Sequence, residues 1–287
     1  METILAVITD WDDAPAVVHR AQFMAAKLHT QVELFRPVHA RLGELNKYIG
    51  FDNFDTLRDA IMSAENKLLA ELNTDQNTQI HSLWCDRVHS AIVSEAERTS
   101  AGLIVLMASH HSLLANLAHT PDDWHLLRDA PCPVWMMTRE LGDLDTVVAA
   151  VDCLDESEQQ QKLSARVIDQ ARAMATAHQL PLSVVTVVPD PALIYASMVN
   201  VPVTIDYLTQ LEQQADGKLR ALLAHLGVTA DNVLVKSGRV EDVLVNLASH
   251  GLLVIGSRAN KGVKGLLLGN SAERILNHMQ SDMLVVN

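Results

Sequence analysis

Leu103-Ile104-Val105-Leu106-Met107 recurs 149 positions further along the chain as Leu252-Leu253-Val254-Ile255-Gly256, and this pair of apolar runs is the strongest indication of the fold. The same shift places Met283-Leu284-Val285-Val286 on Val134-Trp135-Met136-Met137 without a gap. Continuous apolar runs of this length are typical of strands buried on both faces of a parallel sheet. The chain therefore has the pattern of a tandem repeat with one sheet in each half.

Short β-branched runs alternate with stretches of helical period in both halves, which is the signature of βαβ units. The first half is expected to contain strands at Thr3–Thr9, Gln31–Val38, Gln79–Trp84, Leu103–Met107 and Val134–Met137, with helices at Ala14–Leu28, Thr56–Leu72, Val88–Arg98 and Pro121–Arg128. The second half is expected to contain strands at Thr146–Asp152, Leu182–Val188, Asn232–Lys236, Leu252–Gly256 and Met283–Val286, with helices at Ser157–His178, Thr204–Leu226, Val240–Ser249 and Asn270–Met279. We predict an α/β protein with two tandem, doubly wound, Rossmann-like parallel sheets.

The length of 287 residues suits two domains that each bury their own core. The polar stretch 139–145 separates them, giving predicted domains at residues 1–142 and 143–287. A net charge of −13 argues against binding to nucleic acid or to an anionic membrane surface. The three cysteines lack CxxC spacing, the N-terminus lacks a basic leader, and no apolar run approaches about 20 residues. We therefore expect a cytoplasmic protein.

The two halves differ most in the segment that follows the fourth strand. In the second half, glycines at 256, 262 and 269 allow backbone N–H groups to approach a ligand, and Gly269 precedes a helix whose N-terminus attracts anions. Segment 256–274 carries a net charge of +3, from Arg258, Lys261, Lys264 and Arg274 against Glu273. The matching segment 107–125 carries −2. The sequence predicts a site for a small anionic ligand in the second half alone.

The spacing Gly256-x-x-Ala259, nine residues, Gly269-Asn270 resembles the universal stress protein family, whose nucleotide-binding members have G-x-x-G, nine residues and G-S/T. The strand Val147–Asp152 with Ser157 also looks like the family's first strand. The resemblance covers the whole chain as two tandem domains. The run from Thr120 through Trp124 to Trp135 looks most like the two-domain E type of that family.

The resemblance implies an adenine nucleotide such as ATP as the ligand of the second domain. Asp152 would then lie beside the ribose or the adenine, and Val187 would contact the adenine through its backbone. The phosphates would be surrounded by Gly256, Arg258, Ala259, Gly269, Asn270 and Ser271. Ala259 and Asn270 depart from the family's glycine and hydroxyl residue, and Ser271 is the nearest replacement hydroxyl. The first half departs at every motif position, so no nucleotide is expected there.

Single-domain relatives in the family form dimers through their last strands. The resemblance therefore implies that Cys132–Met137 and Ser281–Val286 pair within one chain as a pseudo-dimer, and a homodimer of the whole chain stays open. The resemblance also implies a stress-response role. The sequence has no G-x-x-x-x-G-K-[ST], G-x-S-x-G or HExxH motif, so the leading functional hypothesis is a non-enzymatic stress-response protein.

Two other functions stay open. A carrier or sensor of an amphiphilic ligand is suggested by Met107, by the ten methionines and by the apolar stretch 192–203. Slow ATP hydrolysis is the third hypothesis. Six histidines lie between His81 and His125, but their spacing matches no known zinc pattern, so no metal site is predicted.

Overall fold

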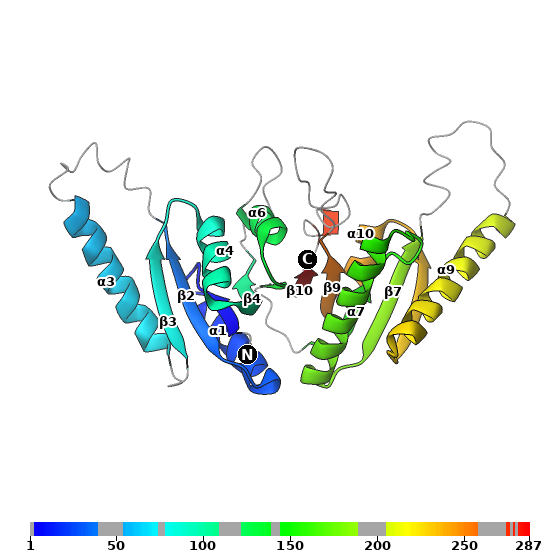
Figure 1. The fold of residues 1–287 in the computed structure, drawn as a ribbon, viewed down its shortest axis with the longest axis horizontal. Coiled ribbons are helices and arrows are strands. Elements are labelled where there is room, and N and C mark those ends of the chain that lie inside the picture. The colour runs from blue at the N-terminus through cyan, green and yellow to red at the C-terminus, as the bar shows by residue number, and fades with distance from the viewer. Residues whose placement is uncertain are drawn as a thin grey trace, which may run out of the picture. The chain divides into compact units, whose positions relative to one another are not determined.

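The computed structural model describes residues 3–39, 54–73, 78–108, 122–138, 144–188, 205–257, 274–275, 278 and 281–287. The chain divides into two compact units, Met1–Arg139 and Glu140–Asn287 (Figure 1). The described residues of each unit form five parallel strands, and the described helices lie on the two faces of each sheet. This arrangement confirms the predicted α/β fold class.

The first unit follows the chain order strand, helix, strand throughout its described part. Its elements are β1 (Thr3–Val7), α1 (Ala14–Leu28), β2 (Val32–Val38), α3 (Phe54–Leu72), β3 (Gln79–Trp84), α4 (Val88–Thr99), β4 (Ala101–Met107), α6 (Asp122–Asp129) and β5 (Val134–Met137). The strands lie side by side in the order β3-β2-β1-β4-β5. Because crossovers between parallel strands are right-handed, α1 and α3 cover one face while α4 and α6 cover the other. The contacts of α1 with α3 and of α4 with α6 agree with this.

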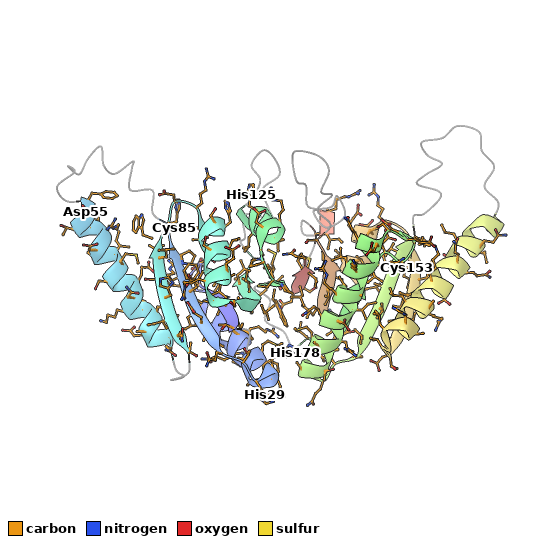
Figure 2. The ribbon with its side chains drawn as sticks, viewed as in Figure 1. His29, Asp55, Cys85, His125, Cys153 and His178 are labelled. Atoms are coloured by element: carbon orange, nitrogen blue, oxygen red, sulfur yellow. The ribbon has the colours of Figure 1, made fainter. Side chains whose placement is uncertain are left out.

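The second unit repeats this topology. Its described elements are β6 (Val147–Ala150), α7 (Glu158–His178), β7 (Leu182–Val188), α9 (Ile205–Leu226), β8 (Asn232–Ser237), α10 (Val240–Leu247), β9 (Leu252–Gly256) and β10 (Met283–Val286). The strand order is β10-β9-β6-β7-β8. Helix α7 ends at His178, near the amino ends of the strands, and Cys153 in the loop that precedes the helix lies near their carboxyl ends (Figure 2).

The predicted elements agree with the described ones apart from a few terminal residues. The largest difference is in β6, which is shorter than the predicted Thr146–Asp152 because its last residues form a loop. The predicted helix Asn270–Met279 lies mostly outside the described residues, as do the stretch 192–203 and the boundary residues 139–143. None of the described helices has both the length and the apolarity needed to cross a bilayer.

The central strands form the two cores. Residues Leu252–Val254 of β9 and Ile104–Val105 of β4 are fully buried, as continuous apolar strands between two helical layers should be. Trp135 on β5 is also fully buried, with the guanidinium of Arg20 5.2 Å from its ring centroid. Trp135 therefore belongs to the core of the first unit.

Candidate functional site

Three of the predicted ligand residues lie at one edge of the second sheet. Asp152 follows β6, Val187 lies near the end of β7, and Gly256 ends β9. Because β6 lies between β7 and β9 and all three strands are parallel, these residues share the carboxyl edge. The chain order reverses direction at β6, and ligands of doubly wound folds bind in the crevice at such a switch point.

The loop after β6 is ordered by its own carboxylates. The Oδ1 atom of Asp152 accepts hydrogen bonds from the backbone N–H groups of Leu154 (3.0 Å) and Asp155 (3.2 Å). Asp155 in turn accepts from the N–H of Ser157, which caps α7 by accepting from Gln160. Asp152 is exposed, and only its first carboxylate oxygen is needed to hold the turn.

The backbone of Val187 is directed toward the same loop. Val151 N donates to Val185 O at 3.0 Å, which is the last pairing of the β6 side with β7. In a parallel strand, residues two apart direct their N–H and C=O groups to the same neighbour. Val187 therefore directs its backbone toward the β6 side, at the level where β6 has ended and the Asp152 loop begins.

Gly256 is a glycine because of packing inside the protein. A Cβ atom at this position would lie 2.6 Å from Cδ2 of Leu163 and 2.7 Å from its Cγ. Helices α1 and α7 can be aligned at their left-handed C-cap residues, His29 and Gln179. In this alignment Leu163 of α7 corresponds to Asp13, which immediately precedes α1. The first unit thus lacks the extra N-terminal turns of α7, and Met107 fills the core there at 3% exposure. The glycine-to-methionine difference thus accompanies the difference in helix length between α7 and α1.

We expect Gly256→Ala to destabilise the second unit by about 1–3 kcal/mol, because overpacking a core forces neighbouring side chains out of position. In a Leu163→Ala background the same change should be nearly neutral. Urea unfolding followed by far-UV circular dichroism measures both. Gly217→Ala is the matched control, because a Cβ there meets nothing within 4 Å and alanine favours a helix. Equal losses from Gly256→Ala in both backgrounds would refute the packing explanation.

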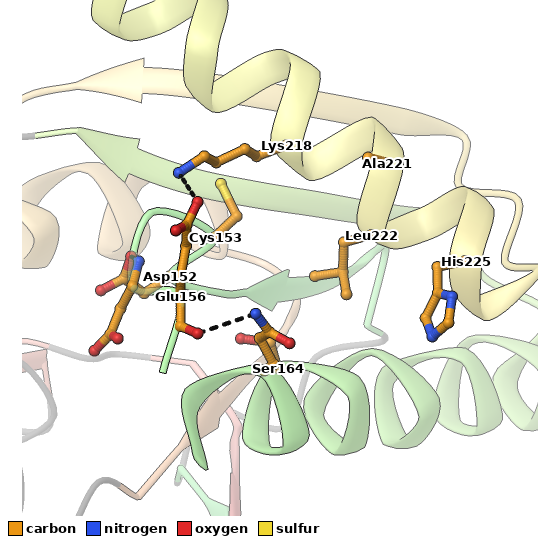
Figure 3. Close-up of a pocket in the computed structure, with 10 residues that line it drawn as sticks. Asp152, Cys153, Glu156, Ser164, Lys218, Ala221, Leu222 and His225 are labelled. Atoms are coloured by element: carbon orange, nitrogen blue, oxygen red, sulfur yellow. Dashed lines mark hydrogen bonds and ion pairs between the residues drawn. The ribbon is translucent and has the colours of Figure 1, made fainter. Parts of the chain in front are cut away.

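A pocket of about 370 Å³ lies beside this edge, between α7 and α9 (Figure 3). Its lining residues are Asp152, Cys153, Asp155, Glu156, Gln161, Ser164, Lys218, Ala221, Leu222 and His225. Lys218 and His225 project from α9 at opposite ends of the pocket. The volume is within the range of small-molecule sites. Sequence reasoning missed the α9 residues, because nothing in their spacing relates them to a loop more than 60 positions away.

The polar groups of the pocket favour hydroxyl donors over phosphate. Three carboxylates, on Asp152, Asp155 and Glu156, face one cation, and Nζ of Lys218 pairs with Oε1 of Glu156 at 2.7 Å. The Lys218 ammonium lowers the pKa of Glu156. Burial raises the pKa of the Cys153 thiol, so this cysteine is protonated and is not an activated nucleophile.

Apart from Gly256, the predicted phosphate-binding residues lie outside the described part of the chain: Arg258, Ala259, Gly269, Asn270 and Ser271. One cation of this segment is described. Nη1 of Arg274 lies 3.7 Å from Oε1 of Glu241 on α10, so part of the predicted positive charge is balanced within the second unit.

The corresponding edge of the first unit is occupied by its own side chains. The hydrogen bond from Ile8 N to Phe35 O matches the one from Val151 N to Val185 O in the second unit. Counting on from these pairs, Thr9 corresponds to Asp152, and Pro37 corresponds to Val187. Proline has no N–H to offer a base. Arg36 donates from Nη1 to the carbonyls of Ile8 (3.0 Å) and Thr9 (2.6 Å). Its Nε donates to Glu65 of α3 at 2.7 Å, and its guanidinium lies 4.9 Å from the Trp11 ring centroid.

The largest carboxyl pKa shifts among the described residues lie elsewhere, on the α4 face of the first unit. Burial raises the pKa of Glu33 to about 7. Burial also acts to raise the pKa of Glu95, but hydrogen bonds from Arg98, Glu33 and His81 outweigh it and bring that pKa to about 2. Glu33 lies near the amino end of β2, so this network does not belong to the carboxyl-edge site.

Two of the clustered histidines stack on each other. The rings of His89 and His125 lie 4.9 Å apart between centroids, and Nη2 of Arg128 lies 3.0 Å from Nδ1 of His125. His110, His111 and His119 lie outside the described residues.

Comparison with known proteins identifies both units. The model of the universal stress protein family matches residues 1–138 and 144–287. Universal stress protein E of Escherichia coli strain K12 is 26% identical over 302 residues, covering 99% of this chain and 93% of its own. A universal stress protein from Pseudomonas aeruginosa UCBPP-PA14 is 24% identical, with a TM-score of 0.71, and covers 100% and 93% of the two chains. The Pseudomonas aeruginosa PAO1 protein PA1789, of unknown function, is 23% identical, with a TM-score of 0.70 and coverage of 100% and 92%.

Proposed function

The chain belongs to the universal stress protein family, as two tandem domains, and on that premise we propose that its second unit binds one adenine nucleotide in a non-enzymatic stress-response role. The observation that carries this proposal is the placement of Asp152 after one strand and of Val187 near the end of the neighbouring parallel strand, at the switch point of the second sheet. A carboxylate accepts from ribose hydroxyls, and a strand backbone offers both a donor and an acceptor to a base. The pocket beside Asp152 provides room for them.

The phosphates would extend from this point toward segment 256–271, where Gly269, Asn270 and Ser271 precede the predicted last helix. A helix N-terminus and nearby cations stabilise a phosphate group. The asymmetry between the units supports a single site, because Arg36 and Pro37 occupy the matching edge of the first unit. A cytoplasmic location and pairing of the two units through their last strands are part of the same proposal.

The test is calorimetric titration of the whole chain with ATP, AMP and cAMP, comparing Asp152→Asn with the parent protein. Asparagine keeps the oxygen that holds the Leu154 and Asp155 turn but removes the charge that a ribose hydroxyl would meet. We expect one nucleotide per chain and about 10–100-fold weaker binding in the variant, since a hydrogen bond to a charged group contributes about 1.5–3 kcal/mol.

Thr9→Val is the matched control, because Thr9 is the counterpart of Asp152 in the first unit, and it should leave the affinity unchanged. Two nucleotides per chain, or equal affinities of parent and Asp152→Asn, would refute the proposed site. Native mass spectrometry of protein purified without added ligand separates a nucleotide from the alternative amphiphile. Met107, one basis of that alternative, is 3% exposed and packs within the core of the first unit.

A further inference from the structure

Two buried carboxylates and an imidazole meet on the α4 face of the first unit. Glu33 comes from β2, His81 from β3 and Glu95 from α4. One possible ligand atom of each lies within 4.8 Å of the others. The side chains of Glu33 and Glu95 are 4% exposed, whereas His81 is 38% exposed and gives the cluster access to solvent.

The two carboxylates of this cluster are paired with the guanidinium of Arg98, which lies at its exposed side. Nη2 of Arg98 donates to Glu33 and, at 2.9 Å, to Oε1 of Glu95, while Nε donates to the second Glu95 oxygen at 3.0 Å. Nδ1 of His81 contacts Oε1 of Glu95. Arg98 lies in the last turn of α4 and its side chain is 54% exposed. Its guanidinium can therefore move into solvent without moving the backbone.

The fold itself does not require this charged cluster. The strand registers place Glu33 beside Gln79 and Ser183 beside Asn232, so Ser183 corresponds to Glu33 and Leu234 to His81. Leu247, at the end of α10, corresponds to Glu95 when the Arg87 and Arg239 caps are aligned. The second unit builds the same topology with a hydroxyl and two leucines. Buried ion pairs are often no more stabilising than such apolar replacements, so stability alone does not account for the cluster.

We propose that Glu33, His81 and Glu95 form a binding site for a divalent transition-metal ion of the zinc class, which enters by displacing the Arg98 guanidinium. Two carboxylates and one imidazole are a ligand set that zinc accepts, with a fourth position for water. Small side-chain rotations would bring the three ligand atoms to the metal–ligand distances of about 2.0–2.2 Å that such ions adopt.

The experiment is titration of the whole chain with Zn²⁺ by calorimetry and with Co²⁺ by visible absorption. The chain holds 13 histidines that can bind further metal ions more weakly. The metal ion bound at the proposed site is therefore recognised as the one that is lost when the ligand residues are replaced. His81→Gln and Glu33→Gln should each weaken the binding of that ion at least about tenfold and remove the absorption of tetrahedral Co²⁺. His89→Gln, in the stacked pair outside the cluster, is the control and should retain it.

Arg98 provides the decisive variant, because a metal site and a structural ion-pair network predict opposite results. Arg98→Gln removes the competitor and should tighten Zn²⁺ binding about tenfold or more. Arg98→Lys keeps one positive charge but lacks the guanidinium that bonds to both Glu33 and Glu95, so its affinity for Zn²⁺ should be intermediate. This variant serves as the test if Arg98→Gln does not fold. Unchanged or weaker Zn²⁺ binding in the folded Arg98 variants, or full binding by His81→Gln, would overturn the proposal.

Discussion

Gly269→Asp is expected to abolish nucleotide binding by the whole chain. The change adds a side chain and a negative charge immediately before the predicted last helix, where the N-terminal N–H groups would hold a phosphate. Steric exclusion and charge repulsion act in the same direction there. Calorimetric titration with ATP measures the loss, and circular dichroism confirms that the variant is folded.

Thr120→Asp is the matched control for Gly269→Asp, because Thr120 occupies the corresponding position of the first half. It should leave both the affinity and the stoichiometry of one unchanged. Loss of binding in Thr120→Asp would indicate a nucleotide site in the first unit and would contradict the proposal. Full binding by Gly269→Asp would remove the glycine segment from the site.

Arg36→Thr is expected to destabilise the first unit by about 2–4 kcal/mol. The Arg36 and Glu65 side chains are 13% and 16% exposed, so the change leaves a nearly buried carboxylate without its counter-ion. The carbonyls of Ile8 and Thr9 lose a donor at the same time. All four tryptophans lie in the first half, so urea unfolding followed by tryptophan fluorescence reports on this unit alone.

Two further variants test the cause of that loss. Arg36→Thr combined with Glu65→Leu should recover much of the stability, because it removes the nearly buried carboxylate together with its counter-ion. Arg58→Thr breaks an ion pair with Asp55 in the same unit in which the two side chains are 44% and 83% exposed, so it should change stability by less than about 1 kcal/mol. A loss of the same small size in Arg36→Thr would mean that Arg36 is an ordinary surface cation.

The elements of the fold were predictable to the extent that each depends on local pattern. Runs such as Leu252–Gly256 and Leu182–Val188 are apolar throughout, and only strands covered on both faces need that composition. The αL cap residues at the ends of α1 and α7 were less predictable, because His29 and Gln179 replace the glycine that usually occupies such positions. The end of β6 was overestimated because Val151 is buried like a strand residue, yet the chain has already turned into the Asp152 loop.

The candidate site was predicted only in part, because its residues come from distant segments. The resemblance gave Asp152, Val187 and Gly256, and the parallel strands bring them to one edge. Lys218, Cys153 and His225 were missed, since a pocket wall is formed wherever two helices pass each other. The carboxylates Glu33 and Glu95 were missed for the same reason, although His81 had been noted among the clustered histidines.

The tandem repeat and the parallel α/β class could be predicted from the amino-acid sequence, because periodicity and apolar runs are properties of neighbouring residues. The family resemblance came from the spacing of Gly256, Gly269 and Asn270. The different packing around Gly256 and Met107 could be seen in the folded chain alone. Leu163, on the extra turns of α7, occupies the space above Gly256, while Met107 fills its own core. The tertiary structure alone also placed Arg36 across the matching edge of the first unit. Whether a position is open or filled depends on side chains that pack from other segments, and spacing along one chain carries no record of them.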